Sequence, residues 1–126
     1  MLIIGHPWIK SQIFHKVFSL EDIKKSQANE IVLLEALVNS HALAQYCQVN
    51  SIVYAVETTS IDDALFANAL GAKYMICEED VALTIQPIAQ EYLFDTRLLV
   101  RIDNEKEMTN LAKSGIDGVI FTEAIK

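Results

Sequence analysis

Acidic residues recur along this sequence at intervals that match one strand plus one helix. Glu35, Glu57, Glu78, Asp103 and Glu123 each follow a short apolar run, at separations of 20 to 25 residues. If these runs are parallel strands, their carboxyl ends meet at one edge of a sheet, where α/β folds place ligands. The spacing therefore predicts a row of carboxylates along that edge.

Three interpretations of this row are open. Carboxylates can satisfy the free amides and the positive dipole at the N-termini of the helices that follow. They can bind a divalent cation such as Mg²⁺, whose preferred ligands are carboxylate oxygens and water, with Glu57, Glu78 and Asp103 as candidate metal ligands. They can also act as a pair in acid–base catalysis, because two like charges placed close together split their pKa values. No spacing in the sequence matches a known metal motif.

His6 is the other residue with catalytic chemistry near a predicted strand end. It follows the first apolar run and precedes Pro7 and Trp8, so it could be a general base or a ligand that acts with Glu57. The alternative is a hydrogen-bonded turn residue, with Trp8 filling the end of the core. No GxGxxG, GxxxxGK[ST] or GxSxG motif is present, which disfavours nucleotide binding and nucleophilic-serine chemistry.

The unit that would position these residues is clearest at residues 98–121. An apolar run at 98–102 predicts a buried strand, and Asn104 with Glu107 forms a capping box for a helix. Gly115 then suits a left-handed helix end before a second buried strand at 119–121. A strand–helix–strand connection this short packs as a right-handed parallel crossover in almost all known cases.

Looser copies of this unit precede it. Ser19 and Ser60 are expected to cap helices, as is Asn39 or Ser40, and Pro87 is expected to make the beginning of its helix irregular. The segment 14–18 is expected to be an edge or hairpin strand. The other expected strands lie at 2–5, 31–34, 52–56 and 74–77.

These elements predict one α/β domain over residues 1–126, made of repeated βα units with a mainly parallel sheet of five to six strands. The sheet could be open and three-layered, like that of flavodoxin, or curled like half a barrel. Half a barrel leaves two long edges unpaired, so we expect the open sheet, with helices on both faces, for a monomer.

Three segments resemble the repeats in the second half of (βα)8 barrels: 58–64 (TTSIDDA), 70–74 (LGAKY) and 114–121 (SGIDGVIF). They are most similar to the class I aldolases of the 2-keto-3-deoxy-6-phosphogluconate type and to related phosphate-binding barrels. The resemblance covers about the last 75 residues and implies a barrel-like architecture. Aldolase activity is not implied, because strand 119–121 has no Schiff-base lysine and Thr122-Glu123-Ala124 replaces the glycine-rich phosphate turn. The chain is also about half as long as a barrel of roughly 250 residues.

Charge and composition narrow the classes of partner. With 17 acidic and 10 basic residues the net charge is −7, which disfavours nucleic acid because its phosphates need Lys and Arg. The longest apolar run, 31–38, is interrupted by Glu35 and is much shorter than the roughly 20 residues of a membrane span. The first residues do not have the pattern of a secretory signal. Cys47 and Cys77 are expected to be buried free thiols in a reducing cytoplasm.

The functional expectation is a non-catalytic binding or regulatory domain, because no complete catalytic constellation or cofactor loop is present. The predicted helix 63–70, DALFANAL, is apolar around much of its circumference, which favours a homodimer or another protein partner. The alternative is a small enzyme that depends on Mg²⁺ or a similar cation and works at the acidic strand ends.

Overall fold

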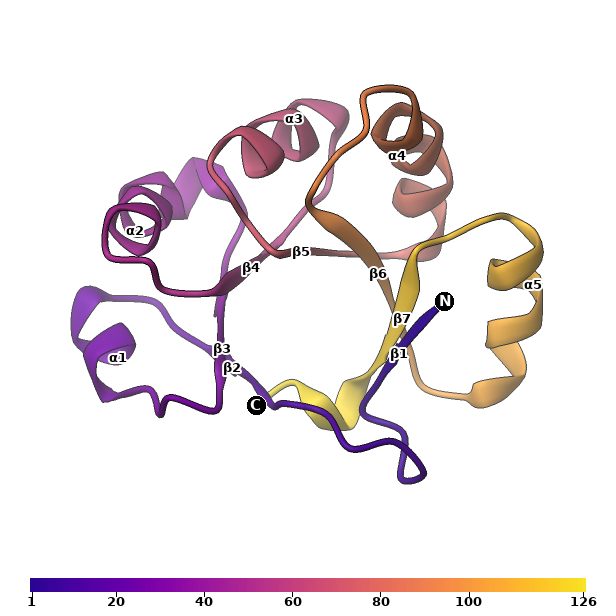
Figure 1. Cartoon of the computed structure of the whole chain (residues 1–126), viewed down its shortest axis with the longest axis horizontal. Helices are drawn as coiled ribbons and strands as arrows, with labels where there is room; N and C mark the ends of the chain where they lie inside the picture. The colour runs from indigo at the N-terminus through magenta and orange to yellow at the C-terminus, as the bar shows by residue number, and fades with distance from the viewer.

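The computed structural model describes residues 1–126 as parallel strands that alternate with helices (Figure 1). Seven strands form one sheet in the order β1-β7-β6-β5-β4-β3-β2, and all neighbours are parallel. The strands are β1 Leu2–Ile4, β2 Phe14–Lys16, β3 Ile31–Leu34, β4 Tyr54–Glu57, β5 Tyr74–Cys77, β6 Arg97–Ile102 and β7 Gly118–Phe121. The helices are α1 Leu20–Lys25, α2 Leu37–Val49, α3 Ile61–Ala69, α4 Glu79–Glu91 and α5 Met108–Lys113, with 3-10 turns η1 Glu105–Glu107 and η2 Thr122–Ala124. Seven strands exceed the five to six predicted, and both the expected first strand and the expected edge strand at 14–18 are present, as the three-residue strands β1 and β2.

The order of the strands explains why the sheet is a half-barrel. From β2 to β7 each strand lies beside the previous one, so every right-handed crossover places its helix on the same face. Figure 1 shows all the helices outside the curve of the sheet. The expectation of an open sheet with helices on both faces is therefore wrong, because a doubly wound sheet needs a point at which the strand order reverses.

The end of the chain requires the sheet to curl. Lys126 N–H donates to the carbonyl of Phe14 at 2.8 Å, and Lys16 N–H donates to the carbonyl of Lys126 at 3.1 Å. In a flat sheet β7 and β2 would lie about 24 Å apart, whereas the four residues from Phe121 to Ile125 span at most about 14 Å. The same hydrogen bonds cover part of the outer edge of β2, which reduces the exposure of unpaired strand edges in a half-barrel.

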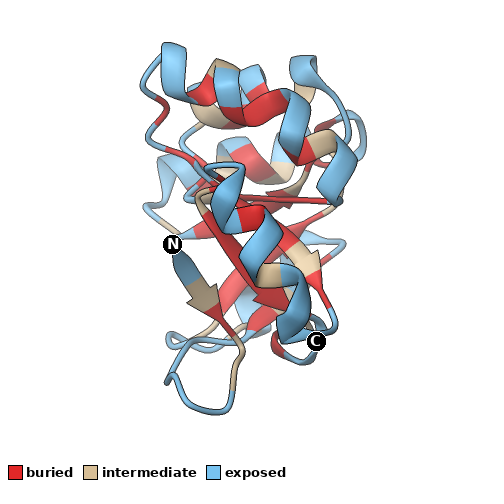
Figure 2. Ribbon diagram, turned by 90° about the vertical axis from the view of Figure 1, so that its right-hand side faces the viewer, coloured by how far each residue is buried: buried red, intermediate tan, exposed pale blue.

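The core has two layers, one on each face of the sheet. Nine buried residues fill the concave side: Ile4, Phe14, Ile31, Leu33, Ala55, Ile76, Leu99, Ile120 and Ala124. The larger cluster lies between the convex side and the helices. Figure 2 shows the buried residues on the strands and on the helix faces turned toward them, while the outer helix faces are exposed.

Local sequence signals predict most of the helix starts. The side chains of Ser19 and Ser60 accept backbone N–H groups in the first turns of α1 and α3, and Asn104 with Glu107 forms the predicted capping box. The prediction of a cap at Asn39 or Ser40 is wrong. Helix α2 begins earlier, after Ala36, and the hydroxyl of buried Ser40 donates to the carbonyl of Glu35 at 2.7 Å.

Pro87 does not disturb α4 as predicted. The helix runs without interruption from Glu79 to Glu91 and includes the proline. Pro87 removes one intrahelical donor, but it lies on the exposed side of the helix, where water can bind the carbonyl left free. None of the helices combines the length and the apolar character that a membrane crossing requires.

Cys47 and Cys77 are free and buried, as the sequence predicts. Burial raises the pKa of the Cys47 thiol to about 11 and that of the Cys77 thiol to about 12. Both thiols are therefore protonated near neutral pH and are poor nucleophiles.

Candidate functional site

The parallel sheet brings the predicted acidic row to one edge, but three of its members accept no backbone N–H from the helices that follow them. Helix α2 follows Ala36 rather than Glu35, and α3 is capped by Ser60 rather than Glu57. Glu78 occupies the N-cap position of α4, yet its side chain accepts no backbone N–H there. Glu57 and Glu78 instead contact a basic side chain.

Arg101 supplies those contacts for two of them. It lies two residues after the inward-facing Leu99 on β6, so its side chain extends from the concave face of the sheet. Its Nη2 lies 3.5 Å from Oε1 of Glu57 on β4, and its Nη1 lies 3.9 Å from Oε1 of Glu78, which follows β5. The guanidinium thus joins the ends of three neighbouring strands.

The strength of this charge cluster is modest. The three side chains are each between about one-third and two-thirds exposed, and pairs of this kind contribute about 1 kcal/mol or less. The Nε of Arg101 is buried and has no hydrogen-bond partner, which reduces the net gain further. The chemical consequence is larger than the energetic one, because a cation of the chain itself lies against both Glu57 and Glu78 and offsets one of their two negative charges.

Asp103, the third predicted metal ligand, has a different partner. Its carboxylate accepts a short hydrogen bond from the hydroxyl of Thr122, and its N–H donates to Glu107. No three His, Cys, Asp or Glu side chains lie close enough together to hold a metal ion. Metal binding by Glu57, Glu78 and Asp103 stays a prediction, and it would need these side chains to move.

His6 lies in a separate pocket at the same edge. This pocket has a volume of about 450 Å³ and is lined by Gly5, His6, Pro7, Asp103, Asn104, Glu105, Phe121 and Glu123. Neither Glu57 nor Glu78 reaches it, so the structure does not bring the predicted catalytic pair His6 and Glu57 into one cavity. Trp8 does not fill the core, because its side chain is 89% exposed.

Both ring nitrogens of His6 already have partners. Nδ1 accepts the backbone N–H of Trp8 at 3.1 Å, so Nε2 carries the proton of the neutral ring and donates to Glu105 at 2.9 Å. Edge-on contacts with Trp8 and Phe121 hold the ring in place. His6 is therefore the hydrogen-bonded turn residue of the second interpretation. Its role as a general base stays a prediction that requires the Trp8 hydrogen bond to break.

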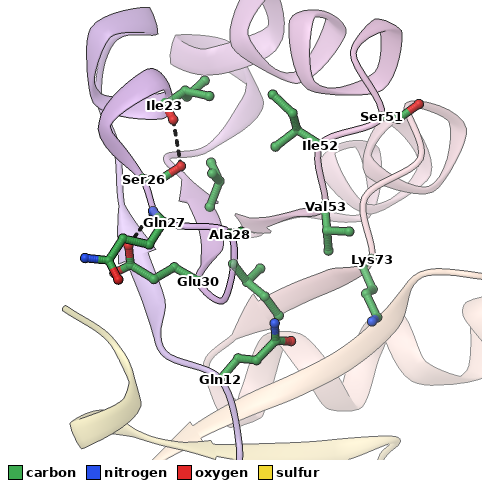
Figure 3. Close-up of a pocket in the computed structure, with 12 residues that line it drawn as sticks. Gln12, Ile23, Ser26, Gln27, Ala28, Glu30, Ser51, Ile52, Val53 and Lys73 are labelled. Atoms are coloured by element: carbon green, nitrogen blue, oxygen red, sulfur yellow. Dashed lines mark hydrogen bonds between the residues drawn. The ribbon is translucent and has the colours of Figure 1, made fainter.

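Another cavity lies at the opposite, amino-terminal edge of the strands (Figure 3). It has a volume of about 430 Å³ and is bordered by segments that precede β3, β4 and β5. Its polar groups stabilise the turn after α1: Ser26 donates to the carbonyl of Ile23, and Glu30 accepts the N–H of Gln27. Ligand sites of parallel α/β folds lie at the carboxyl edge of the sheet. The polar groups of this cavity are therefore better explained as the groups that hold the turn after α1 together.

The largest of these cavities is an apolar groove on the outer surface between α2 and α3. It has a volume of about 530 Å³ and is lined by Leu37, Val38, His41, Gln45, Asp62, Asp63, Phe66, Ala69 and Leu70. Val38 is 78% exposed and Phe66 is 64% exposed, although both are large apolar side chains. The predicted excess of apolar surface on the α3 segment is thus present. We call the surface formed by these nine residues the α2–α3 face.

Two features of the structure were not predicted, although the sequence contains a signal for each. The alternation in RLLVRI places Arg101 on the same side of β6 as Leu99, at the strand end where the acids gather. In addition, no Asp, Glu, Lys or Arg occurs between Glu35 and Glu57, a stretch that includes all of α2. A surface helix normally carries charges on its outer side, so their absence marks this side as unusual.

Neither a protein-family model nor a curated protein matches this chain. The resemblance to the second half of (βα)8 barrels therefore rests on the three sequence segments alone and stays a prediction. The half-barrel architecture rests on the structure itself.

Proposed function

We propose that this protein is a non-catalytic α/β domain that works by binding protein through the α2–α3 face. The observation that carries the proposal is the groove of about 530 Å³ with Val38 and Phe66 exposed beside it. Exposed apolar side chains around a groove are typical of protein-binding surfaces, and aromatic residues with few charges are typical of interface cores.

The carboxyl edge of the sheet supports the non-catalytic part of the proposal. There Arg101 pairs with Glu57 and Glu78, and both nitrogens of His6 have partners within the chain. The buried residues on the concave side are apolar, so they supply no acid, base or nucleophile to a substrate. We place the protein in the cytoplasm, because both of its cysteines are unpaired and buried.

The second candidate function is the cation-dependent enzyme that the sequence suggests. It is favoured by the pocket of about 450 Å³ in which His6, Asp103, Glu105 and Glu123 lie together. In this function Mg²⁺ would be held by Glu57, Glu78 and Asp103, and His6 would act as the base after release of Trp8 N–H. The two functions use different surfaces, which makes them separable.

An NMR experiment on uniformly ¹⁵N-labelled protein separates them. We expect 2-propanol, a small probe with an apolar part, to shift the amides of Val38, His41 and Phe66 more than those of His6 and Asp103. We expect Mn²⁺, which broadens nearby signals, to leave the amides of Glu57 and Glu78 as sharp as exposed amides elsewhere. Selective broadening there, or probe shifts centred on His6, would overturn the proposal and favour the enzyme.

A further inference from the structure

We infer that the partner at the α2–α3 face is a second copy of this chain, bound about a two-fold axis. The inference rests on the proposed function and names its partner. Three properties of the face support it: its lack of charge, its shape and the placement of its few ionisable groups.

The first argument is electrostatic. Each chain has a net charge of −7, so two copies repel one another unless the surfaces that meet are free of charge. Helix α2 contains no Asp, Glu, Lys or Arg, and α3 contains only Asp62 and Asp63 in its first turn. Asp62 and Asp63 are thus the only formally charged side chains among the nine residues of the face. A basic partner would instead be drawn to the acidic carboxyl edge.

The second argument concerns shape. A two-fold contact uses the same patch on both copies, so that patch must contain both a projection and a recess. The α2–α3 face has both, because Phe66 is 64% exposed and lies beside the groove between the two helices. Phe66 of each copy can therefore enter the groove of the other, and both aromatic rings lose contact with water.

The third argument comes from the ionisable groups at the rim. His41 is on α2, whereas Asp62 and Asp63 begin α3. When α2 of one copy packs against α3 of the other, each His41 faces an aspartate across the contact. The imidazole N–H of His41 can donate to that carboxylate, and polar pairs of this kind fix orientation more than they raise affinity.

The size of the face sets the expected strength. Standard interfaces bury about 800 Å² per partner, whereas α2 is only about 20 Å long and α3 about 14 Å. A contact limited to these two helices is therefore at the small end of specific interfaces. We expect a reversible dimer that dissociates in the micromolar range.

Sedimentation velocity over a wide range of protein concentration tests the inference. We expect the wild type to change from monomer to dimer as concentration rises, and Phe66→Asp to weaken the dimer at least tenfold, as loss of an aromatic interface anchor does. Val38→Asp, on the other helix, should weaken the dimer too, because it places a carboxylate in the contact near Asp62 and Asp63 of the other copy, and it serves if Phe66→Asp folds poorly. Trp8→Asp is the matched control, because it changes another highly exposed aromatic residue that lies outside the face.

A charge exchange tests the two-fold orientation. His41→Asp should weaken the dimer, because it places like charges across the contact, and adding Asp62→Lys to the same chain should restore it. A wild type that stays monomeric at high micromolar concentration overturns the second-copy inference alone, since the NMR experiment still tests the proposed function. A dimer that Trp8→Asp weakens and Phe66→Asp does not would overturn both.

Discussion

At the carboxyl edge of the sheet, charged side chains have partners within the chain, whereas on the α2–α3 face large apolar side chains have none. Arg101 contacts Glu57 and Glu78, and His6 contacts Glu105 and Trp8 N–H. Val38 and Phe66 instead lie against solvent. The edge is where this architecture usually places its ligands, yet Glu57, Glu78 and His6 there already contact other groups of the chain. The difference indicates that architecture alone does not locate the working surface of this molecule.

The concave side of the sheet makes the contrast stronger. Its nine apolar residues fill the space that a larger barrel could use for a ligand, and the chain end closes over it beside β2. The outer helices bury only one side each. Apolar side chains are therefore buried inside the curve of the sheet, whereas large apolar side chains remain exposed on the outer helices.

The largest expected effect tests whether β1 and β7 pack closely on the concave side of the sheet. A methyl group at Gly118 would lie 2.6 Å from Cβ and 2.8 Å from the carbonyl oxygen of Leu2 on the neighbouring strand. Gly118→Ala should therefore lower the free energy of unfolding by about 3 kcal/mol, because backbone atoms cannot move aside cheaply. Urea unfolding measures this change.

Gly115→Ala is the matched control for that substitution. Gly115 has a positive φ of 76°, and a methyl group there would meet only Nε2 of Gln90 at 3.7 Å, an ordinary van der Waals distance, so alanine should cost about 1 kcal/mol from backbone strain alone. If the two substitutions cost the same, β1 does not pack tightly against β7. The contrast between a filled inside and an incomplete outside would then be lost.

The next effect tests how completely α2 and α4 cover the convex side. The thiols of Cys47 and Cys77 have pKa values raised from 9.0 to about 11 and about 12 by burial. Above pH 9 the unfolded chain loses these protons while the folded chain keeps them. The stability that the buried, protonated thiols contribute is therefore complete below pH 9 and decreases as pH rises. Each thiol should therefore lower stability as pH rises from 9 toward its folded pKa, with a slope of at most about 1.4 kcal/mol per pH unit.

Urea unfolding between pH 8 and pH 10.5 measures the slope of stability against pH. The double variant Cys47→Ala, Cys77→Ala should be less stable at pH 8 but should lose less with rising pH. An equal slope in both proteins would show that water reaches the thiols, and that the helices cover the convex side poorly.

Local features of this fold could be predicted from the sequence, and features that depend on distant strands could not. Ser19, Ser60 and the Asn104–Glu107 box act within one helical turn, so their residue types are sufficient to place them. The curl of the sheet depends on which strands become neighbours, and no short pattern records that. The sequence predicted that the acids share one edge of the sheet, but not which groups Glu57 and Glu78 contact there. Each short βα unit implies that its strands are parallel, so their carboxyl ends share one edge. The ion pairs of Arg101 with Glu57 and Glu78 depend instead on the order of β4, β5 and β6, which no single unit records.

The smallest expected effect tests whether Arg101 completes the carboxyl edge. Arg101→Gln should lower the free energy of unfolding by less than about 1 kcal/mol at low salt, because its ion pairs are long and partly exposed. At about 1 M NaCl, where the Debye length is about 3 Å, the difference from the wild type should largely disappear. Lys10→Gln removes a cation that forms no salt bridge, so it should show no comparable dependence on salt.

The same variant has a second consequence, because Glu57 and Glu78 lose the cation that they share. Mg²⁺ should then raise the melting temperature of Arg101→Gln while leaving the wild type unchanged. The gain should be small, about 0.4 kcal/mol when the concentration of Mg²⁺ equals its dissociation constant. If the wild type responds to Mg²⁺ as strongly as the variant, Arg101 does not occupy the position of a cation, and the carboxyl edge is as incomplete as the α2–α3 face.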